Sequence, residues 1–214
     1  MIDNTEKIEH IYHYTNLDAL QKILKTNEFI FSDFAKANDY KEKSAKYKDE
    51  ISKYKYISFT YAKELESYSY TNAPLWYFYA DKGHGACICF NKEELLQATK
   101  TIRKGFVDYR NGVSHIDTQS IDEYLMEKRK DWLFEKEYRV IVDDDDCHSI
   151  PNIIQYITAI YIGAEVSEEE ISEFYHCIPE NISVFQMRID IEDGRHQSID
   201  YREKIVLKQM NDER

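Results

Sequence analysis

Proline and glycine are scarce in this sequence, with 3 and 6 residues among 214. Flexible linkers and low-complexity segments are rich in these residues, so their scarcity excludes long disordered linkers. The sequence also has no internal repeat and no shift in composition that would mark a domain boundary. A chain of 214 residues lies within the size of one large domain, and we expect a single domain over residues 1–214.

Long apolar runs are absent as well. No window approaches the roughly 20 apolar residues of a transmembrane helix. The first residues, Met1 to Glu6, lack the basic segment and apolar stretch of a secretory signal. We therefore expect a cytoplasmic protein without membrane contact, whose cysteines are free thiols. These are Cys87, Cys89, Cys147 and Cys177.

Positive charge is in deficit. The chain has 28 Lys and Arg against 40 Asp and Glu, a formal net charge of −12. Non-specific binding to nucleic acid depends on neutralising phosphates with basic side chains. The charge balance therefore disfavours non-specific nucleic-acid binding, although a local basic patch is compatible with it.

Familiar catalytic and metal-binding motifs are also missing. The sequence has no phosphate-binding glycine loop, nucleophile elbow or Cys-His protease signature. The dipeptides Cys147-His148 and His176-Cys177 lack the ligand spacing of zinc modules, and their role stays open. The acidic run 143–146 lacks the alternating ligands and glycine of a calcium loop. We expect no resident metal.

Local patterns predict an α+β fold with a mixed, largely antiparallel sheet and flanking helices. Thr15 is expected to cap a helix whose buried face includes Leu20 and Ile23. Other helices are expected after Pro74, from Asn91 to Lys100, over 121–130 and from Ser167 to Cys177. The expected strands are 11–15, 29–31, 56–60, 86–90, 133–142, 158–162 and 182–191, with a hairpin at Asn111-Gly112.

The strand expected over 133–142 gives the sharpest inference about chemistry. Side chains two apart on a strand share a face, which places Glu135, Glu137 and Arg139 together and Phe134, Lys136 and Tyr138 on the other side. The simpler interpretation is that Arg139 neutralises Glu137 on a solvent-exposed face. The alternative is a carboxylate pair that lines a cleft, with pKa values pushed apart by proximity.

Two earlier strands offer polar pairs of the same kind. His13 shares a face with Thr15, and Ser58 shares a face with Thr60. A lone histidine at a strand end is commonly a hydrogen-bonded structural residue, and Thr15 suits a helix cap better than a ligand contact. Trp76, at helical spacing from its aromatic neighbours, suits the core better than a stacking platform.

Together these segments resemble an uncharacterised bacterial and phage family, catalogued as a domain of unknown function. The resemblance runs from about Ile11 to Ile162, and Tyr40 stands where the family has a proline after Asn-Asp. It brings no known activity with it. The matching motifs are His13-Tyr14-Thr15, Asn38-Asp39, Ser58-Phe59-Thr60, Leu75-Trp76 with Tyr79, and Glu135-x-Glu137-Tyr138-Arg139.

The order of three motifs is also similar to that of ADP-ribosyltransferases. That family has a split mixed sheet with three signature strands, which carry an Arg or a His-x-Thr/Ser, a Ser/Thr or aromatic residue, and a catalytic Glu often within Glu-x-Glu. The chain offers His13-Tyr14-Thr15, Ser58-Phe59-Thr60 and Glu135-Lys136-Glu137 in the same order. One departure is serious, because the first motif lacks the glycine that often contacts the nicotinamide amide, and Tyr14 is bulky.

The resemblance implies a substrate and a role for each matching residue. NAD would be cleaved, with Glu137 stabilising the positive charge that develops on the ribose and Glu135 orienting or deprotonating the acceptor. The acceptor would be a macromolecule, as for a toxin or phage-defence effector. The residues that would bind NAD, by contact or by stacking, are His13, Tyr14, Thr15, Ser58, Tyr138 and Arg139.

Two other function classes stay open. A non-catalytic module that recognises a protein or nucleotide through tyrosines predicts that Glu135 and Glu137 lie exposed and remote from His13. A metal-dependent nuclease would use Glu135, Glu137 and Asp39 as ligands. The expected meeting of the Glu135/Glu137/Arg139 face with His13 and Ser58 distinguishes the transferase from both.

Overall fold

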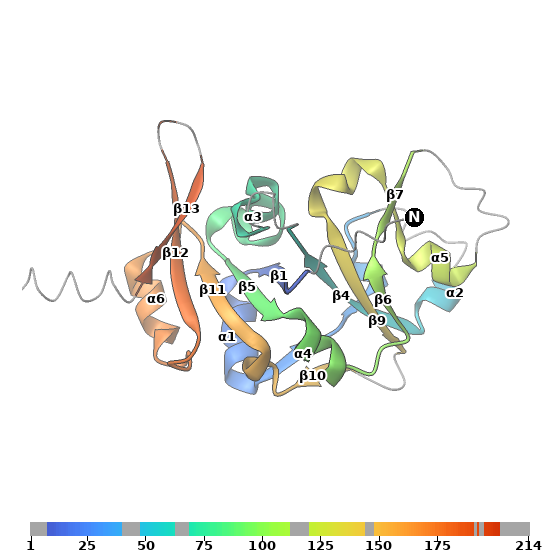
Figure 1. Ribbon diagram of the computed structural model, residues 1–214, viewed down its shortest axis with the longest axis horizontal. Coiled ribbons are helices and arrows are strands. Elements are labelled where there is room, and N and C mark those ends of the chain that lie inside the picture. The colour runs from blue at the N-terminus through green and yellow to red at the C-terminus, as the bar shows by residue number, and fades with distance from the viewer. Residues whose placement is uncertain are drawn as a thin grey trace, which may run out of the picture.

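One large sheet organises the chain (Figure 1). The computed structural model describes residues 8–39, 48–62, 69–111, 120–143, 148–190, 192 and 195–201. Eight strands of the sheet follow the order β13-β12-β11-β5-β1-β4-β9-β6, and β3 pairs with β4 as a ninth. The strands of this sheet are β1 His10–Thr15, β3 Ser32–Asp33, β4 Tyr54–Thr60, β5 Ala86–Asn91, β6 Arg103–Phe106, β9 Glu137–Asp143, β11 Ile157–Ile162, β12 Ser183–Ile189 and β13 His196–Asp200.

Neighbouring strands of this sheet run antiparallel except β11 and β12, which are parallel. Two small sheets lie beside it, an antiparallel pair of β2 (Glu28–Ile30) with β10 (Ser149–Pro151) and a parallel pair of β7 (Asp108–Arg110) with β8 (Glu127–Arg129). The predicted α+β class, with a mixed and largely antiparallel sheet, is confirmed.

Helices cover both faces of the sheet. The helix α1 (Leu17–Thr26) buries Leu20 and Ile23 on one face, against a core that includes Ile57 and Phe59 of β4. On the other face α3 (Ala73–Tyr79) buries Trp76 against Tyr14, Cys87 and Cys89. The remaining α-helices are α2 Lys48–Ile51, α4 Lys92–Ala98, α5 Ile121–Leu125 and α6 Glu168–Tyr175, and the 3-10 helices are η1 Phe34–Lys36, η4 Ser69–Thr71, η5 Asp81–Gly83, η6 Lys130–Glu135 and η7 Ile153–Tyr156.

Several local predictions are confirmed, and three are wrong. Asn16 rather than Thr15 caps α1, because Thr15 is still paired with Ala86 in the sheet while the side chain of Asn16 accepts from the Ala19 amide. The helix expected over 121–130 ends at Leu125, since 127–129 pair with β7 instead. Gly112 of the expected hairpin and Cys147 lie outside the described residues.

The third error concerns the strand expected over 133–142. Residues 130–135 form η6, Lys136 adopts a left-handed conformation with φ 44°, and the strand β9 begins only at Glu137. Side chains at 134–136 therefore do not follow the strand alternation. The prediction of a shared face still holds for Glu137 and Arg139, which lie two apart within β9.

The sheet is joined unevenly at its centre. β1 pairs with β5 at six positions and β4 pairs with β9 at seven, whereas β1 and β4 share the single pair Tyr12 and Thr60. Beyond that pair β1 and β4 separate, and the sheet divides into a β1-side half (β13, β12, β11, β5, β1) and a β4-side half (β4, β9, β6 with β3).

Candidate functional site

The separation of β1 from β4 opens two adjoining cavities, which we call the cleft. The larger has a volume of about 720 Å³, and Thr15, Lys22 and Lys128 are among the residues of its wall. The smaller, of about 60 Å³, is lined in part by Glu135. His13, Ser58 and Tyr79 belong to the walls of both cavities. A volume of several hundred Å³ is typical of small-molecule sites.

The strand register decides which predicted residues share a face. Ser58 lies directly opposite Arg139, and Thr60 lies opposite Glu137. Partners directly opposite in an antiparallel pair point to the same side of a sheet. The predicted meeting of Ser58 with the Glu137/Arg139 face is therefore confirmed.

His13 does not meet that face, and this part of the prediction is wrong. Its neighbour Tyr12 pairs with Thr60, so Tyr12 shares the face of Glu137 and His13 points to the opposite side. There the imidazole packs edge-on against Phe29 and Phe59, at centroid distances of 4.7 and 6.1 Å.

One hydrogen bond joins His13 to the far rim of the cleft. His13 Nδ1 donates to the carbonyl of Ser58 over 2.9 Å, and this bond connects β1 to β4. Because a carbonyl only accepts, Nδ1 carries the proton and Nε2 is left as an acceptor. Burial lowers the pKa of His13, and the bond to Ser58 offsets only part of that effect. The ring is therefore neutral at pH 7.

A buried ion pair occupies the β9 side. The guanidinium of Arg139 donates to both carboxylate oxygens of Glu137, from Nε at 2.7 Å and from Nη2 at 2.8 Å. Its Nη1 donates to the carbonyl of Leu125 at 2.6 Å, and its charge lies 5.0 Å from the centre of the Tyr56 ring. Arg139 is 0 % exposed and Glu137 is 1 % exposed. The predicted neutralisation of Glu137 by Arg139 is correct, but the exposed face expected with it is not.

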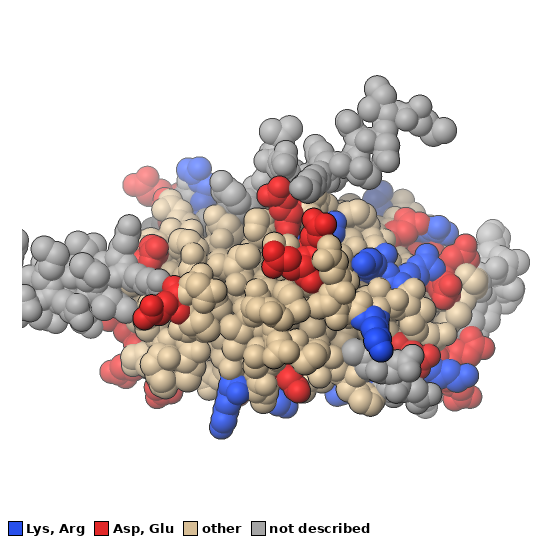
Figure 2. Space-filling model, turned by 60° about the horizontal axis from the view of Figure 1, so that its bottom comes forward, with Lys and Arg blue, Asp and Glu red and all other residues tan. Residues whose placement is uncertain are grey.

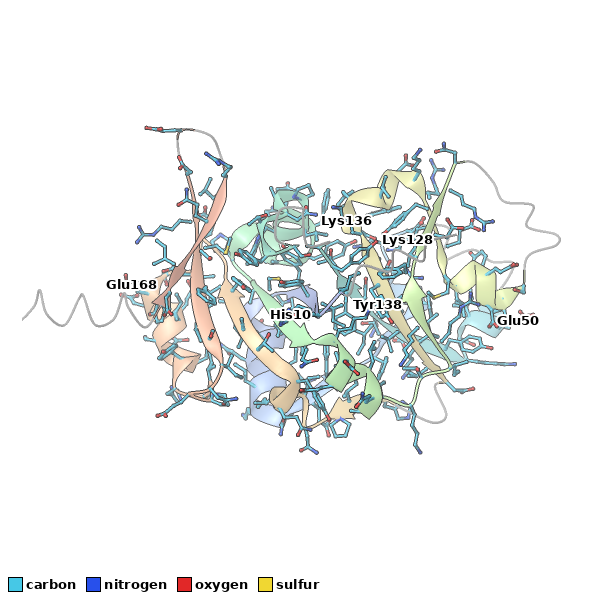
Figure 3. All side chains as sticks on the ribbon, in the orientation of Figure 1. His10, Glu50, Lys128, Lys136, Tyr138 and Glu168 are labelled. Atoms are coloured by element: carbon cyan, nitrogen blue, oxygen red, sulfur yellow. The ribbon has the colours of Figure 1, made fainter. Side chains whose placement is uncertain are left out.

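Lys128 links this ion pair to the cleft. Its Nζ lies 2.9 Å from Glu137 Oε2 and donates to Glu135 Oε2 at 2.6 Å. The hydroxyl of Tyr79 donates to the other oxygen of Glu135. Glu135 therefore presents a carboxylate held from both sides at the wall of the smaller cavity, whereas Glu137 lies behind it among cations. Figure 3 shows Lys128 beside the start of β9.

The two carboxyl groups have pKa values displaced in opposite directions. Burial raises the pKa of Glu135, and the charge of Lys128 counters only part of that. Burial would also raise the pKa of Glu137, but the charges of Arg139 and Lys128 outweigh it and hold the value at about 2. The expected separation of the two pKa values is therefore present. Its main causes are burial and the neighbouring cations, with repulsion between the carboxylates a smaller contribution.

Sequence reasoning missed Lys128. The segment 121–130 was expected to be a helix, and in a helix Lys128 would carry no special meaning. Its role depends on the pairing of β8 with β7, which makes Lys128 part of a strand instead of a helix, and its side chain is buried. The only local sign is a run of polar residues, Glu127 to Lys130, just before an aromatic turn.

Two predicted NAD-binding tyrosines have other contacts. Tyr14 packs edge-on against Trp76 at 5.1 Å, and its hydroxyl donates to the carbonyl of Ser69 at 2.5 Å. Tyr138 lies between Glu137 and Arg139 on β9 and points to the opposite side of the sheet, where its ring centroid is 5.2 Å from that of Phe106. Tyr14 reaches only the wall of the smaller cavity, and Tyr138 is in the wall of neither.

The carboxylates of the site are engaged by cations rather than arranged for a metal. Lys128 contacts Glu135 and Glu137, and Arg139 takes both oxygens of Glu137. Asp39, the third ligand of the nuclease hypothesis, is buried. Within the described ranges, no three His, Cys, Asp or Glu side chains lie close enough together to hold a metal ion.

Surface charge and helix length bear on partners. The face in Figure 2 carries acidic and basic side chains around a large uncharged area. Of the helices that the structure describes, none has the length and apolar character needed to cross a membrane.

Comparison with known proteins identifies no family for this chain. No family model matches the chain, and no curated protein matches it. One solved structure, that of DarT from Thermus sp. 2.9 in complex with NAD+, is similar to the chain with a TM-score of 0.42 and 15% sequence identity. The alignment covers 82% of this chain and 90% of that one. A likeness this loose assigns no function.

Proposed function

We propose that this chain is an NAD-consuming ADP-ribosyltransferase, which cleaves the bond between nicotinamide and ribose and transfers the ADP-ribosyl group to a macromolecule. The observation that carries the proposal is the cleft, where His13, Ser58 and Tyr79 line the same walls as the carboxylate of Glu135. These residues come from β1, β4, α3 and η6, which the separation of the sheet brings to one place.

The cleft fits a dinucleotide in size and charge. Its larger cavity, of about 720 Å³, is within the range that holds drug-sized and cofactor-sized ligands. Its wall holds Lys22, Lys36 and Lys128 together with one acidic residue, Glu28, in a chain whose net charge is −12. Lys36 also pairs with Asp33, and Lys128 pairs with Glu135 and Glu137. Cations gathered in one concave surface attract the two phosphates of NAD. The imidazole of His13 and the hydroxyl of Ser58 offer hydrogen-bonding groups for ribose hydroxyls.

We assign the reacting carboxylate to Glu135 and a positioning role to Glu137. Both oxygens of Glu137 are held by Arg139, whereas Glu135 lines the cleft. When the carbon–nitrogen bond breaks, nicotinamide leaves with the bonding electron pair and positive charge develops on the ribose carbon. Glu135 stabilises that charge and takes the proton of the acceptor as the new bond to the ribose carbon forms.

Lys128 and Tyr79 set the orientation and the protonation state of Glu135. Both donate to its carboxylate, and each donation favours the ionised form. Glu137 in turn holds Lys128, with its oxygen 2.9 Å from Nζ. The ion pair of Glu137 and Arg139 behind the cleft therefore holds Lys128 in place, and Lys128 in turn holds the carboxylate of Glu135.

The test is release of nicotinamide from labelled NAD by the wild-type protein and two isosteric variants. Glu135→Gln is expected to lower the rate about a hundredfold or more, the usual effect of losing a general acid or base. The exposed Glu173→Gln on α6 is the matched control and should leave the rate unchanged. A folded wild-type protein that neither binds nor cleaves NAD would remove the proposal, as would equal rates for wild type and Glu135→Gln.

The pH dependence gives a second readout. The rate should fall as the pH drops through the raised pKa of Glu135, because the protonated carboxyl cannot stabilise the ribose cation. Lys128 lowers that pKa, so Lys128→Met should move the acid limb of the profile to higher pH. A profile that does not move would leave Lys128 without a role in setting the protonation of Glu135.

Neither alternative function gains support. The recognition module predicted exposed carboxylates remote from His13, but Glu135 is 4 % exposed and shares a cavity with His13. The metal-dependent nuclease requires oxygens free for a cation. Lys128 and Arg139 already engage the oxygens that Glu135 and Glu137 would offer.

A further inference from the structure

An aromatic surface lies beside the cleft, made by α3 and η6. Its residues are Tyr77, Phe78, Trp132, Leu133 and Phe134. Tyr77 and Phe78 are each 58% exposed and Leu133 is 47% exposed, which is uncommon for three large apolar residues in one place. Tyr79 and Glu135, the next residues in the chain after Phe78 and Phe134, line the cleft.

The aromatic surface is continuous across the two elements. Ring centroids lie 5.3 Å apart between Tyr77 and Phe78, 5.9 Å between Phe78 and Phe134, and 6.0 Å between Phe134 and Trp132. The side chain of Asn72 also donates to the carbonyl of Phe134 at 2.9 Å, which fixes η6 against the start of α3. Rigid, exposed aromatic residues are typical anchors of protein interfaces.

An acidic hollow of about 740 Å³ adjoins this surface. Its wall includes Asp18 of α1, Asp81 of η5 and Glu170 of α6, together with His84. Phe78 belongs to the wall of the hollow as well as to the aromatic surface, so the two are contiguous. Tyr79 lines both the hollow and the cleft.

We propose that the aromatic surface and the acidic hollow together dock a basic segment of a protein, with an apolar side chain on the aromatic rings and Lys or Arg side chains in the hollow. That this segment is the acceptor of the ADP-ribosyl group rests on the proposed function; the docking itself does not. Charge complementarity favours a basic segment, because carboxylates from three different elements line a single hollow.

The same carboxylates argue against a nucleic acid at this place. Exposed aromatic rings stack well on nucleobases. However, the phosphates that accompany the bases would meet Asp18, Asp81 and Glu170. Lys82 borders the aromatic surface, with its Nζ 6.0 Å from the centre of the Tyr77 ring, but it is not part of the wall of the hollow.

Fluorescence anisotropy with defined probes tests the docking in the absence of NAD. The probes are a labelled 16-residue peptide of Arg and Leu with one Trp, the same peptide with Glu in place of Arg, and a labelled 20-nucleotide single strand. The basic peptide should bind, and its affinity should fall with added salt because the charges are solvent-exposed. Equal binding of the acidic peptide, or tighter binding of the oligonucleotide, would overturn the proposal.

Variants of the aromatic surface and of the acidic hollow test whether the basic peptide binds there. Tyr77→Ser with Phe78→Ser should weaken binding of the basic peptide about tenfold or more, as expected for loss of aromatic anchors. Asp18→Asn with Asp81→Asn should abolish most of the salt dependence. Ile189→Ser, at an apolar position on β12 that is 47 % exposed, should have no effect. If the aromatic variant binds as wild type does, the proposal is wrong.

Two further measurements, on one variant, distinguish the catalytic step from the docking of the peptide. Glu135→Gln should bind the basic peptide with wild-type affinity while it fails to release nicotinamide. If Glu135→Gln binds the basic peptide but still releases nicotinamide at the wild-type rate, the chemistry has been wrongly assigned. If it loses peptide binding, the docking surface has been wrongly assigned.

Discussion

The two halves of the sheet bury different kinds of side chain at their centres. In the β1-side half, β5 is filled by Ala86, Cys87, Ile88, Cys89 and Phe90, none more than 4 % exposed. In the β4-side half, the first three residues of β9 are also buried, none more than 6 % exposed, and two of them are the ions Glu137 and Arg139. Both halves are fully packed, so burial alone does not distinguish them.

The difference lies in what burial costs. Apolar side chains gain free energy when they leave water, whereas a buried ion pair loses hydration that its mutual attraction barely repays. A buried pair is therefore weak support for stability. Its retention in the half that carries Lys128 and Glu135 fits a site in which charge is used, and the apolar half supplies the rigid frame for it.

Loss of Arg139 gives the largest expected effect on this comparison. Arg139→Met leaves Glu137 buried without its partner and should lower the free energy of unfolding by about 3–5 kcal/mol, measured by urea denaturation. The double variant Glu137→Leu with Arg139→Met replaces the whole pair by apolar groups and should recover most of the loss. If the double variant is as unstable as the single one, the ions are not what distinguishes the two halves.

Acid titration of Glu137 gives the next largest effect. Its pKa is about 2 in the folded chain against an ordinary 4.5, so its contribution is complete above about pH 4.5 and is lost as the pH falls towards 2. The stability advantage of wild type over Glu137→Gln should therefore shrink between these pH values by roughly 3 kcal/mol.

Urea denaturation across that pH range measures the difference. The exposed Glu173→Gln serves as the matched control. A difference between wild type and Glu137→Gln that stays constant from neutral pH to pH 2 would contradict the depressed pKa.

The sequence predicted the local features of both halves well. Asn91 and Ser167 begin helices as their capping patterns indicate, and the apolar runs 86–90 and 158–162 lie in central strands. The pairing of Glu137 with Arg139 also follows from strand alternation alone. Each of these depends only on neighbours within a few residues.

What could not be predicted depends on distant partners. The face of His13 is decided by the register of Tyr12 against Thr60, 48 positions further along the chain. Lys128 reaches Glu135 because β8 pairs with β7 rather than continuing a helix. The strand that was expected to begin at 133 is interrupted at Lys136, a non-glycine residue with a positive φ that local propensity does not indicate.

The cap of α1 provides the smallest test and returns to the β1-side half. Asn16 Oδ1 accepts from the Ala19 amide at 2.8 Å, so Asn16→Ala should cost about 1 kcal/mol and speed hydrogen exchange at Ala19. Thr15→Val keeps the shape of a β1 residue paired with Ala86 and should leave that amide protected. If Thr15→Val instead exposes the Ala19 amide, the cap belongs to Thr15. The end of β1, which forms one rim of the cleft, would then have to be redrawn.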